Sequence, residues 1–269
     1  MKELTEKEFV LIRDYIKDNF GINLGNEKKS LIYSRLRSVL QEKGFANFSQ
    51  YFKYLINDKS GLAVIQFIDK ITTNHTFFMR ESEHFKYFEE VVLPHIEKTA
   101  KTKDLRLWCA GCSSGEEAYT LEMIANDYFC NKPDWNTQIL ATDISENVLD
   151  KAIKGVYEND SVKILPQKWH KLYFKEYGNN KKIVVDEIKK NIIFRKFNLM
   201  SDVFPFKRPF QVIFCRNVMI YFNDETRDKL VEKYYNVLEP NGYLFIGHSE
   251  SLSNTSSKYK YVMPAVYQK

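Results

Sequence analysis

Hydrophobic positions in the first seventy residues recur at helical spacing. Phe9, Ile12, Ile16 and Phe20 lie three or four residues apart, and Gly21 follows the last of them. Such spacing is typical of a helix with one buried face, and a glycine just past the last apolar position ends such a helix. The stretch therefore predicts a helix that ends near Gly21.

Three further helices, and no strand, are predicted before residue 72. They cover residues 27–43 with Gly44 just past the end, a stretch that opens at residues 47–49, and residues 61–71. We predict a small all-helical N-terminal domain over residues 1–71. Residues 71–80 form a junction without a clear period, and Ser82 is expected to cap a long amphipathic helix. The positions on one side of that helix are Phe85, Phe88, Val91, Val92, His95 and Ile96.

From residue 105 onward, short apolar runs alternate with helical patterns. The predicted strands cover residues 105–110, 137–142, 191–197, 210–215 and 242–247, and the helices cover residues 116–129, 145–154 and 224–238. This alternation predicts βαβ crossovers and a mostly parallel sheet, an α/β fold. Residues 259–262 and 265–268 indicate an antiparallel hairpin at the sheet edge. Residues 173–190 indicate a small hairpin off the main sheet, with an irregular excursion as the alternative.

Composition and charge narrow the class of protein. The formal net charge of the 269 residues is +5, which suits a partner with an acidic face and is too mild to favour nucleic acid. The sequence has no apolar run near the ~18 residues that span a bilayer, and its first residues are charged. Four cysteines are too few for a disulfide scaffold. We therefore expect a cytoplasmic protein without membrane insertion.

The loop after the first predicted strand carries the strongest local signal for ligand binding. Residues 111–115 read GCSSG and are followed by a predicted helix that opens with Glu116 and Glu117. Glycines at this place let a ligand approach the backbone at the carboxyl edge of the sheet. A dinucleotide is disfavoured, because G-x-G-x-x-G is incomplete and the two acids repel a pyrophosphate. A structural turn remains an alternative.

Two other functions compete for the loop. It matches the G-x-S-x-G nucleophile elbow, with Ser113 as nucleophile and His248 and Asp143 as partners, although that elbow normally follows several strands. S-adenosylmethionine has an adenosine and an amino acid but no phosphate. Asp143, at the end of the second strand, would suit its ribose hydroxyls, and Glu117 would suit its ammonium group.

The cysteines and histidines do not predict a metal or redox site. Cys109 of the C-x-x-C pair lies in a predicted strand, whereas a redox pair needs its first cysteine at a helix N-terminus. No second cysteine pair is spaced for zinc, and the histidines show no ligand spacing. We expect no metal.

Five motifs follow in order along the chain: TTNHTFFMRE at residues 72–81, SSGEEAY at 113–119, ATDI at 141–144, FCRNVMIYF at 214–222 and GHSE at 247–250. Together they resemble the CheR-type chemotaxis receptor methyltransferases. Residues 72–81 (TTNHTFFMRE) are similar to the family's TTN-x-T-x-F-F-R-E, and residues 113–119 (SSGEEAY) to its S-T-G-E-E-P-Y. Residues 141–144 (ATDI) resemble its second-strand end. Residues 214–222 (FCRNVMIYF) and 247–250 (GHSE) resemble its F-C-R-N-V-x-I-Y-F and G-H-S-E. The chain departs from the family's motifs at two positions. Ala118 stands in place of the usual proline, and Met79 stands in place of the second phenylalanine.

The resemblance implies a protein-glutamate O-methyltransferase. It would transfer a methyl group from S-adenosylmethionine to glutamates on the helical cytoplasmic part of chemoreceptors, leaving S-adenosylhomocysteine. It implies a small helical domain and a Rossmann-like methyltransferase domain, here residues 72–269, and we expect a monomer. In some members a hairpin like that of residues 173–190 binds a receptor tether peptide by strand addition, and the sequence does not decide this.

The resemblance also assigns site residues by position. Asn74, Thr76 and Arg80 would contact the methionine end of the cofactor. Glu117 would hold its amino group and Asp143 its ribose. Asn198 and Leu199 would meet the adenine, Arg216 and Asn217 would line the reaction centre, and Tyr221 would sit near the methyl group.

Methyl transfer to a carboxylate needs alignment rather than a base. Glutamate is already ionised at pH 7, since its unperturbed pKa is near 4.3. In-line displacement therefore requires only that the reacting atoms are positioned. Arg80 is a candidate to attract the substrate glutamate, with a salt bridge to Glu81 or Glu83 as the structural alternative. Tyr221 is a candidate to orient the glutamate oxygen, with aromatic packing as its alternative.

The second N-terminal helix has a basic face. Its cations are Lys28, Lys29, Arg35, Arg37 and Lys43, against only two acids, Glu27 and Glu42. We interpret this face as a docking surface for an acidic receptor helix, with an ordinary solvated face as the alternative. A methyltransferase with a small-molecule or nucleic-acid acceptor, and a receptor-binding module without catalysis, are the rival functions.

Overall fold

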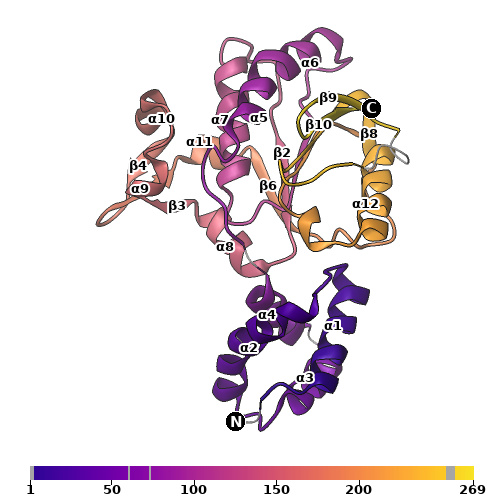
Figure 1. Cartoon of the computed structure of the whole chain (residues 1–269). Coiled ribbons are helices and arrows are strands. Elements are labelled where there is room, and N and C mark those ends of the chain that lie inside the picture. Colours follow the sequence, from indigo (N-terminus) through magenta and orange to yellow (C-terminus); the bar gives the residue numbers. More distant parts are fainter. Residues whose placement is uncertain (1–2, 60, 73, 253–257) are drawn as a thin grey trace.

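The N-terminal part of the protein is a bundle of helices. The computed structural model describes residues 3–59, 61–72, 74–252 and 258–269. The bundle contains α1 (Glu6–Phe20), η1 (Asn26–Lys28), α2 (Lys29–Lys43), α3 (Phe48–Asn57) and α4 (Leu62–Ile71) (Figure 1). Thr5 and Glu8 form a capping box that starts α1, and Gly21 ends it in a left-handed conformation with φ 69°. Phe9, Ile12 and Ile16 are buried, as their spacing predicts.

The second part is built on a seven-stranded sheet, and the predicted α/β class is confirmed. Its strands are β1 (Leu107–Ala110), β2 (Ile139–Asp143), β6 (Ile192–Lys196), β7 (Phe210–Cys215), β8 (Leu238–Ile246), β9 (Lys260–Met263) and β10 (Val266–Gln268). The order is β6-β2-β1-β7-β8-β10-β9, and the first five strands are parallel. β9 and β10 form the predicted antiparallel edge hairpin. In chain order, β2 and β6 are added on one side of β1, and β7 and β8 are added on the other side. This reversal of the strand order leaves a crevice at the carboxyl ends of β1 and β7.

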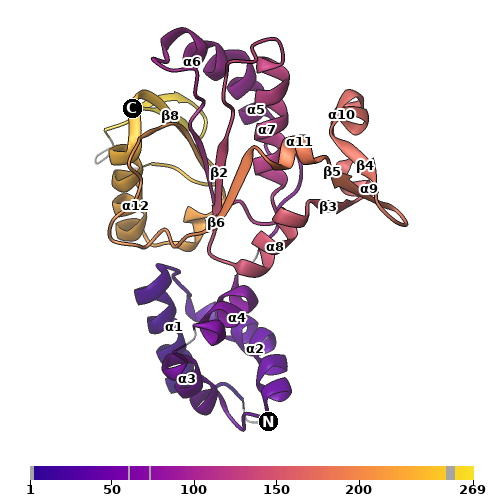
Figure 2. The same ribbon diagram turned by 180° about the vertical axis from the view of Figure 1, so that it is seen from behind.

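Helices cover both faces of this sheet. One side carries α5 (Ser82–Tyr87), η2 (Phe88–Val92), α6 (Leu93–Thr99), α7 (Glu116–Phe129) and α8 (Glu146–Lys154), and the other carries α12 (Asp224–Val237) (Figures 1 and 2). Alternate residues of β1 serve the two cores: Cys109 packs in the first and Trp108 in the second. β1 and β7 are buried along their whole length, as expected for central strands between two helical layers.

Ser82 does not cap the helix that follows it, so that prediction is wrong. The N-cap is Glu81, in a left-handed conformation with φ 55° and without a side-chain cap bond, and Ser82 is the first helical residue. At this backbone turn the Glu81 carboxylate bonds to Arg216, Asn217 and His248. The Ser82 hydroxyl comes one residue too late to cap the helix. The helix is also interrupted by the π-helical η2, and Val91 is exposed rather than packed.

The insertion forms a separate antiparallel sheet, and the irregular alternative is wrong. β4 (Phe174–Glu176) pairs with β5 (Lys181–Val184) as the predicted hairpin. β3 (Val156–Glu158), which the sequence did not predict, pairs with the other side of β5. The short helices α9 (Asn159–Val162), α10 (Gln167–Leu172) and α11 (Asp186–Lys189) accompany it. This sheet projects away from the main sheet (Figures 1 and 2).

The helical part is attached close to the crevice. Ile22 forms an isolated antiparallel bridge with Phe222, just after η3 (Met219–Tyr221), and the main-chain N–H of Asn23 donates to the oxygen of Tyr221 at 2.7 Å. This strand-like pairing was not predicted. Within the part of the chain that the structure describes, none of the helices has the length and apolarity to cross a membrane.

Candidate active site

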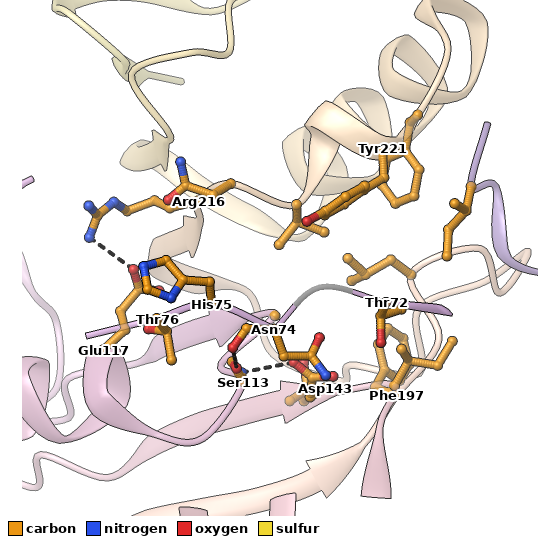
Figure 3. A pocket seen from close by; sticks show the side chains of 18 of the residues that line it. Thr72, Asn74, His75, Thr76, Ser113, Glu117, Asp143, Phe197, Arg216 and Tyr221 are labelled. Carbon is orange, nitrogen blue, oxygen red and sulfur yellow. Dashed lines mark hydrogen bonds and ion pairs between the residues drawn. The ribbon is translucent and has the colours of Figure 1, made fainter. Parts of the chain in front are cut away.

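One pocket at the carboxyl edge of the sheet gathers all ten predicted catalytic and cofactor residues. Its empty space is about 1010 Å³, counting the part open to solvent. The predicted residues that line it are Asn74, Thr76, Arg80, Glu117, Asp143, Asn198, Leu199, Arg216, Asn217 and Tyr221. They come from the junction before α5, the first turn of α7, the end of β2, the loops after β6 and β7, and η3. Figure 3 labels Asn74, Thr76, Glu117, Asp143, Arg216 and Tyr221. The chain therefore concentrates its motifs where an open α/β sheet binds ligands.

The loop after β1 is held tightly against the end of β2. Gly111 and Ser113 have φ of 92° and 49°, and the main-chain N–H of Gly111 donates to the oxygen of Thr142 at 2.8 Å. A side chain at Gly111 would meet Val218, so only glycine fits there. The N–H of Ser113 donates to an Asp143 carboxylate oxygen at 2.8 Å, which fixes that carboxylate at the pocket wall (Figure 3).

Asp143 keeps its carboxylate in a largely buried position through main-chain donors. Its other oxygen accepts the N–H of Ser145 at 3.0 Å, and Ser145 is the N-cap of α8, the helix predicted over residues 145–154. Burial raises the pKa of Asp143, and the hydrogen bonds from Ser145 and Ser113 oppose that rise. A carboxylate fixed in this way is an acceptor for hydroxyl groups of a ligand.

A buried arginine at the pocket wall joins two carboxylates. The side chain of Arg216 is 1% exposed. Its guanidinium lies 2.9 Å from a carboxylate oxygen of Glu117 and 3.0 Å from one of Glu81, and it donates to the main-chain oxygen of Arg80. Burial raises the pKa of Glu117, while the positive charge of Arg216 lowers it. The network holds two acids and one base, which favours a ligand that brings positive charge.

Glu81 is a site residue that the sequence reasoning missed. Its carboxylate accepts from the side-chain amide of Asn217 at 3.2 Å and from the N–H of His248 at 3.3 Å, in addition to Arg216. Burial alone would raise the pKa of Glu81, but the charge and hydrogen bond of Arg216 bring it below its usual value. The available signal was its place beside Arg80 in the R-E pair of the motif.

Arg80 and Tyr221 both line the pocket but come from different segments, the junction before α5 and η3. The Arg80 guanidinium donates to the main-chain oxygen of His75 at 2.9 Å and lies 5.9 Å from the centre of the Phe77 ring, rather than pairing with Glu81. Tyr221 belongs to η3, and its ring extends over the pocket across from Asn74 and Asp143 (Figure 3).

The end of the pocket at Asn198 and Leu199 is mainly apolar and includes the helical part of the chain. The Asn198 side chain accepts the N–H of Met200 at 2.9 Å and donates to the oxygen of Asn19 at 3.0 Å. The apolar lining of this end of the pocket comes from Phe20, Ile22, Phe197, Leu199 and Phe222. Phe20 and Ile22 were missed as site residues, because the local pattern marks them only as helix and turn positions.

Two rival site chemistries lack the geometry they need. The Ser113 hydroxyl donates to the oxygen of Asn74 at 3.1 Å, and Asp143 is used by main-chain N–H groups, so these residues are not arranged as a nucleophile and its base. Cys109 and Cys112 are buried free cysteines, and burial raises the pKa of both thiols, which makes them unreactive.

The structure brings together a group of potential metal ligands that the sequence did not predict. Glu81, His84 and His248 bring ligand atoms within 4.8 Å of one another. The Arg216 guanidinium already pairs with the Glu81 carboxylate at 3.0 Å. A metal ion would have to displace this cation or sit beside it, so the charge arrangement disfavours metal binding.

The basic residues of η1 and α2 are not among those that line the pocket, and they have different surroundings. Lys28 and Arg37 are exposed, and Lys29 pairs with Glu6 at 2.8 Å. Arg35 is half-buried and donates to the main-chain oxygens of Ile71 at 2.5 Å and Thr72 at 3.3 Å. Arg35 therefore secures the connection between the two parts of the chain, a role that the charge pattern did not indicate.

Comparison with known proteins assigns both parts of the chain to one family. The family described as CheR methyltransferase, SAM binding domain, matches residues 74–267, and CheR methyltransferase, all-alpha domain, matches residues 7–72. The chemotaxis protein methyltransferase of Borreliella burgdorferi is 42% identical over 270 residues, which cover 99% of this chain and 95% of the relative. The corresponding protein of Escherichia coli is 31% identical over 268 residues, covering 98% and 91%. A probable chemotaxis protein methyltransferase of Rhizobium etli is 35% identical over 242 residues, covering 88% and 90%.

Proposed function

The chain belongs to the CheR methyltransferase family as an S-adenosylmethionine-dependent chemotaxis protein methyltransferase, and from this premise we propose that it forms methyl esters on glutamates of chemoreceptors. The observation that carries this proposal is the gathering of all ten predicted residues around one pocket. The acceptors would be glutamates on the helical cytoplasmic part of methyl-accepting receptors, and the reaction would take place in the cytoplasm.

The residues of the pocket fit S-adenosylmethionine. The buried Nε of Arg216 has no hydrogen-bond partner among the described residues, which suits a ligand that brings an acceptor such as a carboxylate. The carboxylates of Glu117 and Asp143 suit an ammonium group and ribose hydroxyls. The apolar end at Leu199 suits an adenine ring. When bound, the cofactor supplies a methyl group on a positively charged sulfur.

The protein's contribution to the reaction would be positioning. Asn74, Thr76 and Arg80 would hold the methionine end, and Asn198 would meet the adenine. Arg216 and Asn217 would shape the reaction centre. No general base is needed, because an acceptor glutamate is ionised at pH 7 and attacks in line once it is aligned.

Arg80 and Tyr221 are proposed to act on the acceptor. The positive charge of Arg80 at the pocket wall would attract a glutamate carboxylate. The Tyr221 hydroxyl would donate a hydrogen bond that orients the attacking oxygen. Both residues are half-buried, so they are accessible to a side chain that enters from solvent.

The exposed cations Lys28, at the end of η1, and Arg37, in α2, are the core of the proposed docking surface for the receptor. Lys28 and Arg37 are exposed, which suits long-range attraction to an acidic helix. Lys29 and Arg35 would contribute less, because Lys29 already pairs with Glu6 and Arg35 with main-chain oxygens.

Calorimetric titration with S-adenosylhomocysteine tests the cofactor assignment. We expect saturable binding to the whole chain and its loss in Asp143→Ala. The matched control is Asp186→Ala, in the projecting insertion. Absence of binding to the unaltered chain, or equal binding to both variants, would overturn the assignment of the pocket.

A further inference from the structure

The helical part of the protein meets the pocket through residues 20–23, which connect α1 to η1. Gly21 turns the chain in a left-handed conformation, and Ile22 then pairs with Phe222 in an antiparallel bridge. The N–H of Asn23 donates to the main-chain oxygen of Tyr221 at 2.7 Å. This segment therefore lies along η3, the element that carries Tyr221.

The segment and the residue just before it, Asn19, are also fixed to the loop after β6. The Asn198 side chain donates to the oxygen of Asn19 at 3.0 Å. A Cβ built at Gly21 would lie 2.4 Å from the sulfur of Met200, so the backbone packs closely against that loop. Residues 20–23 thus contact two loops of the methyltransferase part, each of which carries predicted site residues.

Two side chains of the segment reach the pocket itself. Phe20 and Ile22 are half-buried and line it together with Leu199 and Phe222. These four apolar side chains come from both parts of the chain. A flat heteroaromatic ring has two apolar faces, and apolar side chains on opposite sides suit it.

Resting on the proposed function, we propose that residues 20–23 form part of the cofactor site and position Tyr221. Phe20 and Ile22 complete the apolar end that receives the adenine ring. The hydrogen bond from Asn23 holds the backbone of Tyr221, and thereby its ring, over the reaction centre. Tyr221 is the residue that acts on the acceptor, and Asn23 is a positioning residue that acts through it.

Two substitutions separate these roles. Ile22→Ala shortens the apolar wall and keeps the backbone bridge, so we expect an approximately tenfold higher Kd for S-adenosylhomocysteine. Asn23→Pro removes the N–H donor, and proline suits an extended chain. We expect it to lower kcat for receptor methylation approximately tenfold and to change the Kd by less than threefold.

Matched controls come from the same region of the chain. Leu11→Ala removes an exposed apolar side chain of α1, and Asn26→Pro places a proline at the first residue of η1, where a helix accepts it. Both controls should retain the Kd and kcat of the unaltered chain. Thermal unfolding of all four variants checks that they fold. If Asn23→Pro does not fold, the Kd of Ile22→Ala alone decides whether residues 20–23 belong to the cofactor site.

The outcomes also separate this inference from the proposed function. Receptor methylation by the unaltered chain, with unchanged Kd in Ile22→Ala and unchanged kcat in a folded Asn23→Pro, would overturn the inference and leave the proposed function standing. If the unaltered chain neither binds S-adenosylhomocysteine nor methylates a receptor, the proposed function fails and this inference fails with it.

Discussion

Charged side chains occupy two contrasting regions of this molecule. In the pocket, Arg216 is buried between Glu81 and Glu117 at 3.0 and 2.9 Å. In the helical N-terminal part, by contrast, Lys28 of η1 and Arg37 of α2 are exposed. A buried charge has lost its water of hydration and depends on its ion-pair partner for stabilisation. An exposed charge keeps its water, and salt screens its interactions.

The contrast indicates how each region works. The buried charges fix geometry, because removal of Arg216 would leave two carboxylates without their cation, and removal of either carboxylate would leave Arg216 with one partner fewer. The exposed charges act at a distance on an approaching partner and contribute little to the stability of the fold. Substitutions in the two regions should therefore differ in size and in salt dependence.

The largest difference is expected between two arginines. Arg216→Gln leaves two largely buried carboxylates without their cation, and we expect it to reduce the free energy of unfolding by about 3–5 kcal/mol. Arg37→Gln, on the exposed face, should change it by less than about 0.5 kcal/mol. Urea denaturation of both variants measures this, and equal effects would contradict the distinction between the regions.

A buried glutamate that has no cationic partner among the residues the structure describes provides a second contrast. Glu122, on the same helix as Glu117, accepts from Thr137 at 3.1 Å and Asn191 at 2.8 Å, and burial raises its pKa to about 8. The unfolded chain has the lower pKa, near 4.5. The folded chain therefore retains a proton that the unfolded chain releases, and stability falls as the pH rises from about 4.5 to about 8.

Substitution of Glu122 tests this sign. Glu122→Gln should remove much of this decline. Between pH 5 and pH 8.5, the free energy of unfolding of Glu122→Gln should therefore fall by about 1–3 kcal/mol less than that of the unaltered chain. Denaturant unfolding at the two pH values is the measurement, with Glu83→Gln on the surface of α5 as the control. An unchanged pH profile in Glu122→Gln would show that this carboxyl is ionised in the folded protein.

Glu81→Gln weakens the pocket network without breaking it. Arg216 keeps its partner Glu117, so the fold should be preserved while the positions of Arg216 and Asn217 become less defined. We expect kcat/KM for receptor methylation to fall about tenfold, which corresponds to the loss of one charged hydrogen bond. Steady-state kinetics measure this, and activity equal to that of Glu83→Gln would contradict it.

The smallest effect is expected on the exposed face. The double substitution Lys28→Glu with Arg37→Glu should raise KM for the receptor several-fold at low ionic strength and leave the affinity for S-adenosylhomocysteine unchanged. The difference should shrink as salt is added, because exposed charges are screened. Lys98→Glu, at the far end of α6, is the matched control. A salt-independent effect, or none, would argue against docking through α2.

Local patterns predicted most of the fold because they reflect which side of each element is buried. The apolar runs that became β1, β2 and β7 are buried strands, and the loop at Gly111 lies at the predicted edge. Ile22 was not predicted to pair like a strand, since its partner Phe222 lies far along the chain. No local period can encode such a contact.

The misses in the pocket have a similar origin. The motif drew attention to Arg80, but the role of Glu81 depends on Arg216, which only the folded sheet brings close. Ser82 has the chemistry of a cap, yet the left-handed backbone at Glu81 displaces it into the first helical turn. Arg35 looked like a surface charge until the structure placed it against Ile71.

Transfer of labelled methyl groups tests the central claim most directly. The purified chain would be incubated with S-adenosylmethionine labelled in its methyl group and with the cytoplasmic part of a methyl-accepting chemoreceptor. We predict label on receptor glutamates as an ester that mild alkali releases as methanol, and none with Asp143→Ala. Label that never reaches the receptor, or that remains bound after alkali, would contradict glutamate methyl-ester formation.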